Sequence, residues 1–452
     1  MRTIYIDCTY LYRHRHLNTG IQRVVRKVIE NLDALSEKYA LRIVPVSIGN
    51  GEFIPIAAEH LCPTSATEQA AAPTAGHRVL SYLYGVYRAL LELACAVLPH
   101  DRVRHFMFAP QEKFGVSYLL DRGLVRPLTR LVALAQGKTA RKTADAFAVV
   151  EEQDILLLLD STWYCNIWPS VEAFRARKVR VVAVIYDLIP VTHPQFCDAF
   201  LAEVFKNWFF QSLHYIDGYI TISQTVQHDL MQFMENEFGD EVKQKVFDHF
   251  PLGCDFLSQA EQAGTVRQSL QNSFENSSTY LIVSTVEPRK NHEYLLDVFD
   301  QLWEQDTLVN LCIAGRIGWK VEAVMERIQN HPQNNIRLYL WSDLNDEEIL
   351  YCYTNAKMLL FPSIVEGFGL PIVESLSNGL PVLASDTPIH REVGGDQVGY
   401  FDLEDTTTLR DLIRHIETSG IPDSLTVKED YRWMDWRESS EVLLKKITAI
   451  GA

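Results

Sequence analysis

The clearest indication of the fold of this chain is the segment Met358-Leu-Leu-Phe-Pro-Ser-Ile-Val-Glu-Gly-Phe-Gly-Leu-Pro-Ile-Val-Glu374. Its apolar start predicts a buried strand, and Pro371 is typical of the first turn of a helix, where its missing N–H costs nothing. Gly367 and Gly369 let the backbone between these elements approach a ligand closely. Strand, glycine loop and helix together predict one unit of an open α/β sheet, with a ligand bound at the carboxyl edge of its strands.

Two carboxylates flank this loop, Glu366 at its start and Glu374 in the opening turns of the helix. Alone, the pair would also suit a capped helix whose acidic residues complement its dipole. A second segment, Thr285-Val-Glu-Pro-Arg-Lys-Asn291, favours a binding site instead. It follows another strand, and its adjacent Arg289 and Lys290 suit a diphosphate, the first as a bidentate fork and the second as a point charge. Cations and carboxylates in one α/β half predict a nucleotide-sugar site.

The same alternation of strands and helices runs outward from both segments and predicts a doubly wound parallel sheet in the second half. The expected strands are Tyr280–Thr285, Leu308–Ala314, Ile336–Leu340, Ala356–Phe361 and Pro381–Ala384, and the expected helices are Asn291–Trp303, Val321–Gln329, Glu347–Asn355 and Pro371–Asn378.

The first half predicts another parallel, helix-covered sheet. A strand at Arg2–Cys8 leads through a loop at Thr19-Gly20 to a helix from Ile21, and further strands are expected at Leu41–Ile48, Asp154–Leu159, Lys178–Ile185 and Gly218–Ile222. The length of 452 residues also suits two domains. We therefore expect one domain over 1–256, a second over 257–430, and a C-terminal helix over 431–452 that packs back on the first.

A segment at about 78–143 fits neither sheet and is expected to be a helical insertion in the first domain. It holds eleven Lys/Arg against four Asp/Glu, although the whole chain carries a formal charge of −16. Two interpretations stay open: a basic face exposed to solvent, or peripheral contact with an anionic membrane.

Bulk properties exclude several classes of protein. The acidic total argues against a nucleic-acid partner, since such affinity comes from Lys and Arg neutralising phosphates. The eight cysteines are scattered without metal-ligand spacing, which indicates reduced thiols and a cytoplasmic protein. The N-terminus lacks the apolar region of a signal peptide, and no run of about eighteen apolar residues predicts a membrane span.

The motifs resemble family 4 of the retaining glycosyltransferases, which have the GT-B architecture of two facing Rossmann-like domains. The carboxylate pair Glu366 and Glu374, the stretch 287–291, the strand and glycine loop 311–319 and the segment 251–255 each match that family's pattern. The resemblance is dense across about 280–400 and thinner before it. Ser284 departs from the family, which has a small glycine there, and this alters the expected phosphate loop.

The resemblance implies roles for these residues. Arg289 and Lys290 would hold the donor diphosphate without a metal, and Glu374 would bind the ribose hydroxyls. Glu366 and the N–H groups of the glycine loop would bind the sugar. No cofactor is implied beyond the nucleotide sugar itself, which is a substrate. The implied donor-binding set is Thr19, Gly20, Arg289, Lys290, Glu366, Gly367, Phe368, Gly369, Leu370 and Glu374.

Candidates in the first half are fewer. The strand before Tyr186 resembles one after which many members carry His-Asp, so Asp187 joins Glu366, Arg289 and Lys290 as an expected catalytic residue. Tyr186 and His193 rank below it, and His193 also suits a loop histidine without a catalytic role.

Trp341 and Leu344, at the end of a strand in the second half, either pack on the base or belong to the core. The two residues are therefore secondary candidates for the donor site.

The resemblance therefore implies a retaining, metal-independent transfer of a hexose, with GDP-mannose as the first donor to test. The acceptor would be a growing glycan, lipid-linked, in bacterial surface polysaccharide or O-antigen synthesis, and the protein would be peripheral on the inner face of the cell membrane. Two alternatives stay open: a nucleotide-sugar epimerase of the same architecture, and a catalytically silent scaffold subunit.

Overall fold

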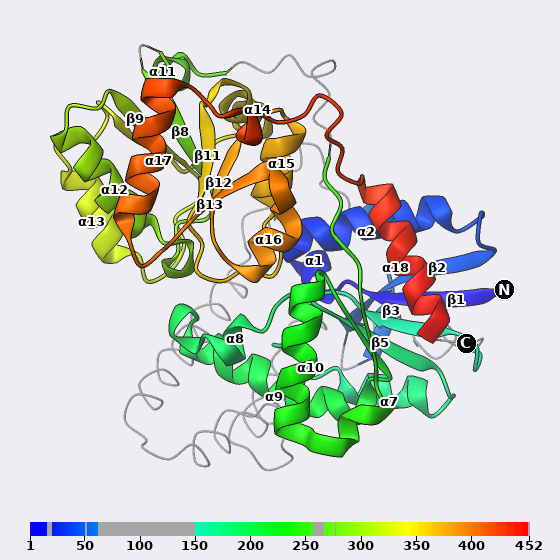
Figure 1. Cartoon of the computed structure of the whole chain (residues 1–452). Coiled ribbons are helices and arrows are strands. Elements are labelled where there is room, and N and C mark those ends of the chain that lie inside the picture. The colour runs from blue at the N-terminus through cyan, green and yellow to red at the C-terminus, as the bar shows by residue number, and fades with distance from the viewer. Residues whose placement is uncertain (16–19, 50–51, 62–149, 256–265, 276, 451–452) are drawn as a thin grey trace, which may run out of the picture. The chain divides into compact units, whose positions relative to one another are not determined.

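The computed structural model describes residues 1–15, 20–49, 52–61, 150–255, 266–275 and 277–450 (Figure 1). Thr19 and the expected basic insertion at 78–143 lie outside them. The chain forms two compact units. The first comprises Met1–Ile220, Gln232–Asp248 and Ser440–Ala452, and the second comprises Thr221–Met231 and His249–Ser439.

The first sheet has seven strands in the order β3-β2-β1-β4-β5-β6-β7. Strand β1 lies between β2 and β4, and both pairings are parallel. The central strands are buried on both faces, which explains their unbroken apolar runs. Their bounds are β1 Arg2–Asp7, β2 Leu41–Gly49, β3 Glu52–Pro55, β4 Ile155–Leu158, β5 Arg180–Ile185, β6 Gly218–Thr221 and β7 Val246–His249.

Strand β3 differs from the expected parallel sheet, because it pairs with β2 in antiparallel orientation at the sheet edge. The sequence between the two strands is Asn50-Gly51, the dipeptide most favoured in two-residue hairpins. That signal was present in the sequence and was not used in the prediction.

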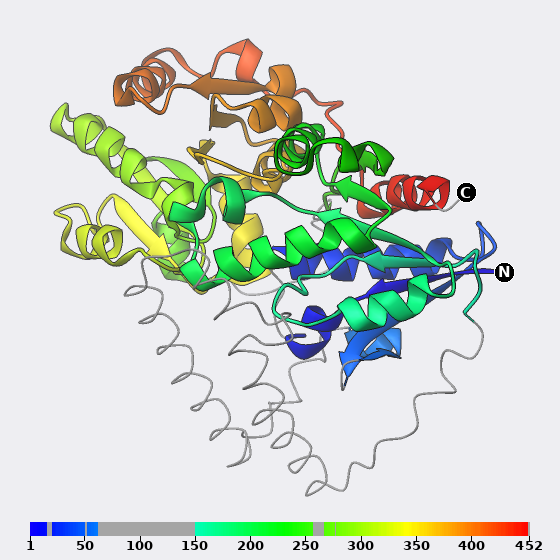
Figure 2. The same cartoon turned by 90° about the horizontal axis from the view of Figure 1, so that it is seen from below.

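In the described part of the first unit, the α-helices are α1 Thr9–Arg13, α2 Ile21–Leu35, α7 Trp168–Arg175, α8 Ile189–Thr192 and α9 Ala199–Tyr215. Helices α10 Gln224–Phe238 and α18 Trp436–Ile450 each run from one unit into the other along the chain. In the first unit, Glu441 of α18 pairs with Lys38, and the Arg2 guanidinium donates to the Thr448 carbonyl at 3.3 Å. Both chain ends therefore lie at one end of this unit (Figure 2).

The second sheet has six strands in the order β10-β9-β8-β11-β12-β13, and all its pairings are parallel. The order reverses direction between β8 and β11, the topological switch point at which open α/β sheets bind ligands. The bounds are β8 Ser278–Val283, β9 Val309–Ala314, β10 Leu338–Trp341, β11 Met358–Phe361, β12 Val382–Ser385 and β13 Val398–Phe401. Strand β13 is one more than the five expected, because its four residues have no clear apolar alternation.

Helices cover both faces of this sheet (Figure 1). The main apolar core joins side chains of the strands to those of α12, α13 and α17. Helices α14 and α15 contact strands β8, β11 and β12. The helices of the second unit are α11 Gln268–Asn272, α12 His292–Glu304, α13 Glu322–Asn330, α14 Asp346–Asn355, α15 Leu370–Ser377, α16 Pro388–Gly394 and α17 Thr406–Ser419. Among the residues described, no helix is both long and apolar enough to cross a membrane.

Candidate active site

The two motif segments meet at the switch point of the second sheet. The Arg289 loop follows β8 and the Glu366 loop follows β11, and these strands pair side by side with Met358 opposite Tyr280. A backbone hydrogen bond of 2.8 Å from the Ile364 N–H to the Arg289 carbonyl joins the loops. Parallel pairing therefore brings together residues that are 76 positions apart in the sequence.

Four ionised side chains form a cluster there, which we call the ion cluster: Glu287, Arg289, Lys290 and Glu366. Arg289 bridges two carboxylates, with its Nη1 2.6 Å from Glu366 Oε2 and its Nη2 2.6 Å from Glu287 Oε1. The Lys290 ammonium pairs with the other oxygen of Glu366. The side chains are 3%, 21%, 10% and 7% exposed in chain order, so the charges interact in a poorly solvated place.

Burial and mutual attraction act in opposite directions on these groups. Burial by itself raises the pKa of Glu366, but the charges of Arg289 and Lys290 more than offset it and hold that pKa at about 2. Burial lowers the pKa of Lys290, and the Glu366 carboxylate opposes that shift. The Lys290 ammonium also lies over the Phe361 ring, 5.2 Å from its centroid. Glu366 is therefore ionised at neutral pH and bound to two cations.

The cations precede the following helix, which was expected from Asn291. They lie in a separate 3₁₀ turn, Pro288–Lys290, and α12 begins two residues after Lys290 at His292. Asn291 joins the two elements in a left-handed conformation with φ 58°, which asparagine tolerates better than most residues. This turn, rather than the helix, aims both cations at the Glu366 loop.

The glycine loop ends where α15 begins at Leu370. Gly369 has φ 105°, a conformation that disfavours a side chain, and Pro371 occupies the first turn as expected. Phe368 is buried, and its ring lies 6.0 Å from that of Trp433. The loop is thus fixed from both ends.

Glu374 is held by a residue that sequence reasoning did not select. The Tyr353 hydroxyl donates to Glu374 Oε2 at 2.9 Å, and Tyr353 is buried on α14. A phenol that donates to a carboxylate fixes its orientation. Glu287 was also not selected as a site residue, although it lies within the quoted motif. Nothing local in the sequence indicates the Tyr353 contact, because it depends on how α14 packs beside α15.

The loop after β9 supports the cation-bearing loop from behind. The Val286 N–H donates to the Arg316 carbonyl at 2.8 Å, and the Gly318 N–H donates to the Val286 carbonyl at 2.9 Å. A Cβ atom on Gly315 would lie 1.9 Å from the Ser284 carbonyl oxygen, so only glycine fits there. Ser284, the departure from the family pattern, lies with its hydroxyl 3.3 Å from His292 Nε2.

The other expected candidates of the second unit, Trp341 and Leu344, are partly buried. Trp341 ends β10, and the Arg267 guanidinium lies over its ring at 5.5 Å. Arg267 is itself bound by Glu348 and Asp343.

Three of the first-unit candidates, Tyr186, Asp187 and His193, follow the carboxyl end of β5. Asp187 Oδ1 accepts a 3.0 Å hydrogen bond from the Ile189 N–H at the start of α8. Tyr186 is buried, and its hydroxyl donates to the Leu159 carbonyl at 2.8 Å, which suits a packing role. His193 follows the last residue of α8, and its Nδ1 lies 2.9 Å from the Thr192 hydroxyl. Gly20 precedes α2 with φ 55° and ψ −131°, a conformation that glycine favours.

Two buried carboxyl groups of the first unit were also not selected. Asp7 ends β1 and Asp160 follows β4, so both lie at the switch point of the first sheet. Burial and the neighbouring Asp160 raise the pKa of Asp7 to about 7, and burial raises that of Asp160 to about 6. Asp7 Oδ1 accepts from the Thr9 hydroxyl at 2.6 Å, and Asp160 Oδ2 accepts from the Leu11 N–H at 2.7 Å.

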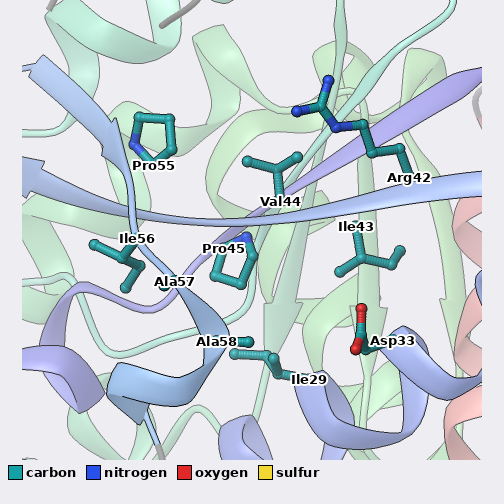
Figure 3. A pocket seen from close by; sticks show the side chains of 10 residues that line it. All are labelled: Ile29, Asp33, Arg42, Ile43, Val44, Pro45, Pro55, Ile56, Ala57 and Ala58. Carbon is teal, nitrogen blue, oxygen red and sulfur yellow. The ribbon is translucent and has the colours of Figure 1, made fainter.

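A cavity of about 350 Å³ lies elsewhere in the first unit (Figure 3). Aliphatic and proline side chains of α2, β2, the end of β3 and the segment after it line the cavity. Two charged side chains, Asp33 and Arg42, also line it. None of the expected site residues lines this cavity.

Comparison with known proteins agrees with this geometry. Residues 267–423 match the family model described as "Glycosyl transferases group 1", a segment that contains the ion cluster and Glu374. Together with two sheets that each have the doubly wound strand order, this match agrees with a GT-B fold of two Rossmann-like halves.

Particular relatives carry more specific names. The chain is 28% identical over 321 residues to the serotype-specific mannosyltransferase WbdA of Escherichia coli, a match that covers 68% of this chain and 38% of that protein. It is 26% identical over 223 residues to the O-antigen chain mannosyltransferase B of the same species, over 49% of this chain and 56% of the other. The chain thus spans well under two thirds of the length of these relatives.

A solved structure matches nearly the whole chain. The crystal structure of a glycosyltransferase from Rickettsia africae ESF-5 has a TM-score of 0.55 with 14% sequence identity, over 99% of this chain and 98% of the other. At that identity the likeness concerns the fold.

Proposed function

We propose that this chain is a retaining, metal-independent glycosyltransferase that moves a hexose from a nucleotide sugar, with GDP-mannose as the first candidate, to a glycan acceptor. The observation that carries the proposal is the pairing of Glu366 with both Arg289 and Lys290 at the switch point of the second sheet. Two adjacent cations suit a diphosphate, and a carboxylate beside them suits sugar hydroxyls. The names of the mannosyltransferase relatives support mannose as the sugar.

The proposed chemistry needs charge stabilisation more than a protein nucleophile. The bond between the hexose C1 and the phosphate oxygen breaks, and its electron pair stays on that oxygen. The acceptor hydroxyl forms the new bond on the same face, and its proton passes to the departing phosphate oxygen. Arg289 and Lys290 would stabilise the negative charge on the leaving nucleotide, and Glu366 would orient the hexose.

Acceptor recognition belongs to residues of the first unit in this proposal. Asp187 is the first candidate, since it follows β5 at the carboxyl edge where such sheets bind ligands. The O-antigen name of one relative supports a growing surface polysaccharide as the acceptor, and a lipid-linked form would suit the basic sequence at 78–143. Flotation with anionic and with neutral vesicles tests this point: binding to both or to neither contradicts a role for the basic segment.

A panel of nucleotide sugars tests the donor. Thermal unfolding is measured with GDP-, UDP- and dTDP-sugars, because a bound ligand raises the midpoint in proportion to RT ln(1 + [L]/Kd). We expect GDP-mannose to give the largest rise. No rise with any nucleotide sugar contradicts the proposal.

Product analysis then separates the alternatives. An epimerase would convert the donor without an acceptor, whereas a scaffold subunit would neither transfer nor hydrolyse it. A retaining glycosyltransferase gives a free nucleoside diphosphate and a lengthened glycan whose anomeric configuration matches the donor. An inverted product would contradict the retaining mechanism while leaving transfer intact.

A further inference from the structure

One carboxylate occupies both cations of the ion cluster. Glu366 Oε2 lies 2.6 Å from Arg289 Nη1, and its Oε1 pairs with the Lys290 ammonium. The carboxylate thus bridges a guanidinium and an ammonium with its two oxygens. A bound diphosphate is expected to bridge the same two cations with two of its own oxygens. Glu366 therefore holds the positions that a donor phosphate would need.

The charges of the cluster lead to the same conclusion. Arg289 and Lys290 carry two positive charges, and Glu287 and Glu366 carry two negative ones, so the cluster is neutral. A neutral cluster exerts little attraction on a diphosphate, whereas removal of Glu366 from the cations exposes a net positive charge.

Enclosure adds a steric reason. The Lys290 side chain is 10% exposed and that of Glu366 is 7% exposed, so the pair shields its own charges from solvent. There is little room beside Lys290 for a phosphate and the Glu366 carboxylate together, so a phosphate binds Lys290 more easily once the carboxylate has left.

We propose that Glu366 and the donor diphosphate compete for Arg289 and Lys290, so that donor binding exchanges one anion for the other and releases the Glu366 carboxylate to the hexose. The inference rests on the proposed function and adds to it a coupling between two contacts. When the diphosphate binds Arg289 and Lys290, the Glu366 carboxylate becomes free to bind the hexose. A donor that carries a sugar therefore gives Glu366 a new partner in place of the two cations.

The variant Glu366→Gln tests this exchange with inorganic pyrophosphate as the probe. Pyrophosphate binds the cations but offers nothing to Glu366, so it should bind the variant about tenfold or more tightly than the wild type in calorimetric titration. A residue that only binds the hexose would leave pyrophosphate affinity unchanged when it is replaced. Equal or weaker binding by the variant overturns the proposal.

Glu374→Gln is the matched control. It removes one negative charge from the same motif, on a carboxylate that accepts from Tyr353, and should leave pyrophosphate affinity within about twofold at physiological salt. An equal gain in both variants would show a general effect of net charge and would overturn the exchange.

A second measurement uses the wild-type protein and avoids any folding defect of the variant. In a crystal structure with GDP-mannose, we expect Lys290 to contact phosphate and Glu366 to contact the hexose. An intact Lys290–Glu366 pair beside a bound diphosphate overturns the exchange. If pyrophosphate binding behaves as expected but no nucleotide sugar binds, the exchange stands and the proposed function fails.

Discussion

Glu366 differs from the other site residues because it satisfies two cations at once. Removing it leaves Lys290 and Arg289 as buried charges without one of their carboxylate partners. Breaking a fully buried ion pair in this way lowers the free energy of unfolding by about 3–5 kcal/mol. Arg289 in turn contacts both Glu366 and Glu287. Stability and chemistry are therefore linked at these residues.

Glu366→Ala and Arg289→Ala are each expected to abolish transfer, a loss of at least about a hundredfold in kcat/KM, because each removes a charge from a poorly solvated site. Circular dichroism should show that both variants remain folded at 25 °C. The control is Arg391→Ala, which breaks the exposed Arg391–Asp386 pair in the same unit and should keep nearly full activity. Near-normal turnover by either site variant would refute the assignment.

Tyr353→Phe is expected to raise the KM for the donor about fivefold or more with little change in kcat, since Glu374, the proposed ribose-binding residue, would lose the hydrogen bond that fixes its carboxylate. Tyr351→Phe, two residues away on the same helix, is the control and should leave both constants unchanged. A fall in kcat at constant KM would assign Tyr353 another role.

At the scale of elements, the candidate site depends on how the loops after β8, β9 and β11 support one another. The β9 loop approaches the β8 loop so closely that Gly315, with φ 153°, leaves no room for a side chain. The β8 loop is bonded in turn to the β11 loop through Ile364. A change at Gly315 should therefore reach the ion cluster through the backbone.

Gly315→Ala is expected to lower the stability of the second unit by more than about 3 kcal/mol and to weaken donor binding, because the new Cβ would overlap the Ser284 carbonyl. Gly379→Ala is the control, because it introduces backbone strain without an overlap between the new Cβ and another atom. Gly379 has φ 74° but open space around its Cβ position, so this variant should lose about 1 kcal/mol or somewhat more and keep donor affinity. Equal effects of the two changes in urea unfolding would contradict this explanation.

For the molecule as a whole, the two units differ in how their switch points carry charge. The second unit places paired ions there, whereas the first unit buries the carboxyls of Asp7 and Asp160. Because burial raises both pKa values above the ordinary 3.8 of aspartate, the folded protein holds protons that the unfolded chain releases.

Stability is therefore expected to fall as the pH rises from about 4 toward 7, where these groups ionise in the folded state. Their contribution is fully present below the unfolded pKa and is lost once the pH passes the folded pKa. Asp7→Asn, which resembles the protonated acid, should flatten the dependence between about pH 4 and 7, a window set by the ordinary pKa of 3.8 and the pKa of about 7 that Asp7 has in the folded protein. Urea unfolding of both proteins across that window measures the difference, and parallel curves would contradict the assignment.

Much of the second unit was predictable from local sequence. The apolar run at 358–361 and Pro371 predicted a strand and a helix start with a glycine loop between them, and the structure has all three in that order. The 3₁₀ turn that carries the cations was not predicted, because a turn of three residues has no repeating apolar pattern. Strand β13 was missed for lack of alternation, and β3 because its Asn-Gly signal was not used.

Local sequence was enough to predict candidate residues for phosphate and sugar, because side-chain chemistry and turn preference are local properties. Tertiary structure alone decided that Glu366 meets Arg289 and Lys290, that Tyr353 holds Glu374, and that Asp7 is buried near Asp160. These contacts follow from which strands pair and how the helices pack on them. Such choices are made by burial of apolar surface along the whole chain, so no short segment records them.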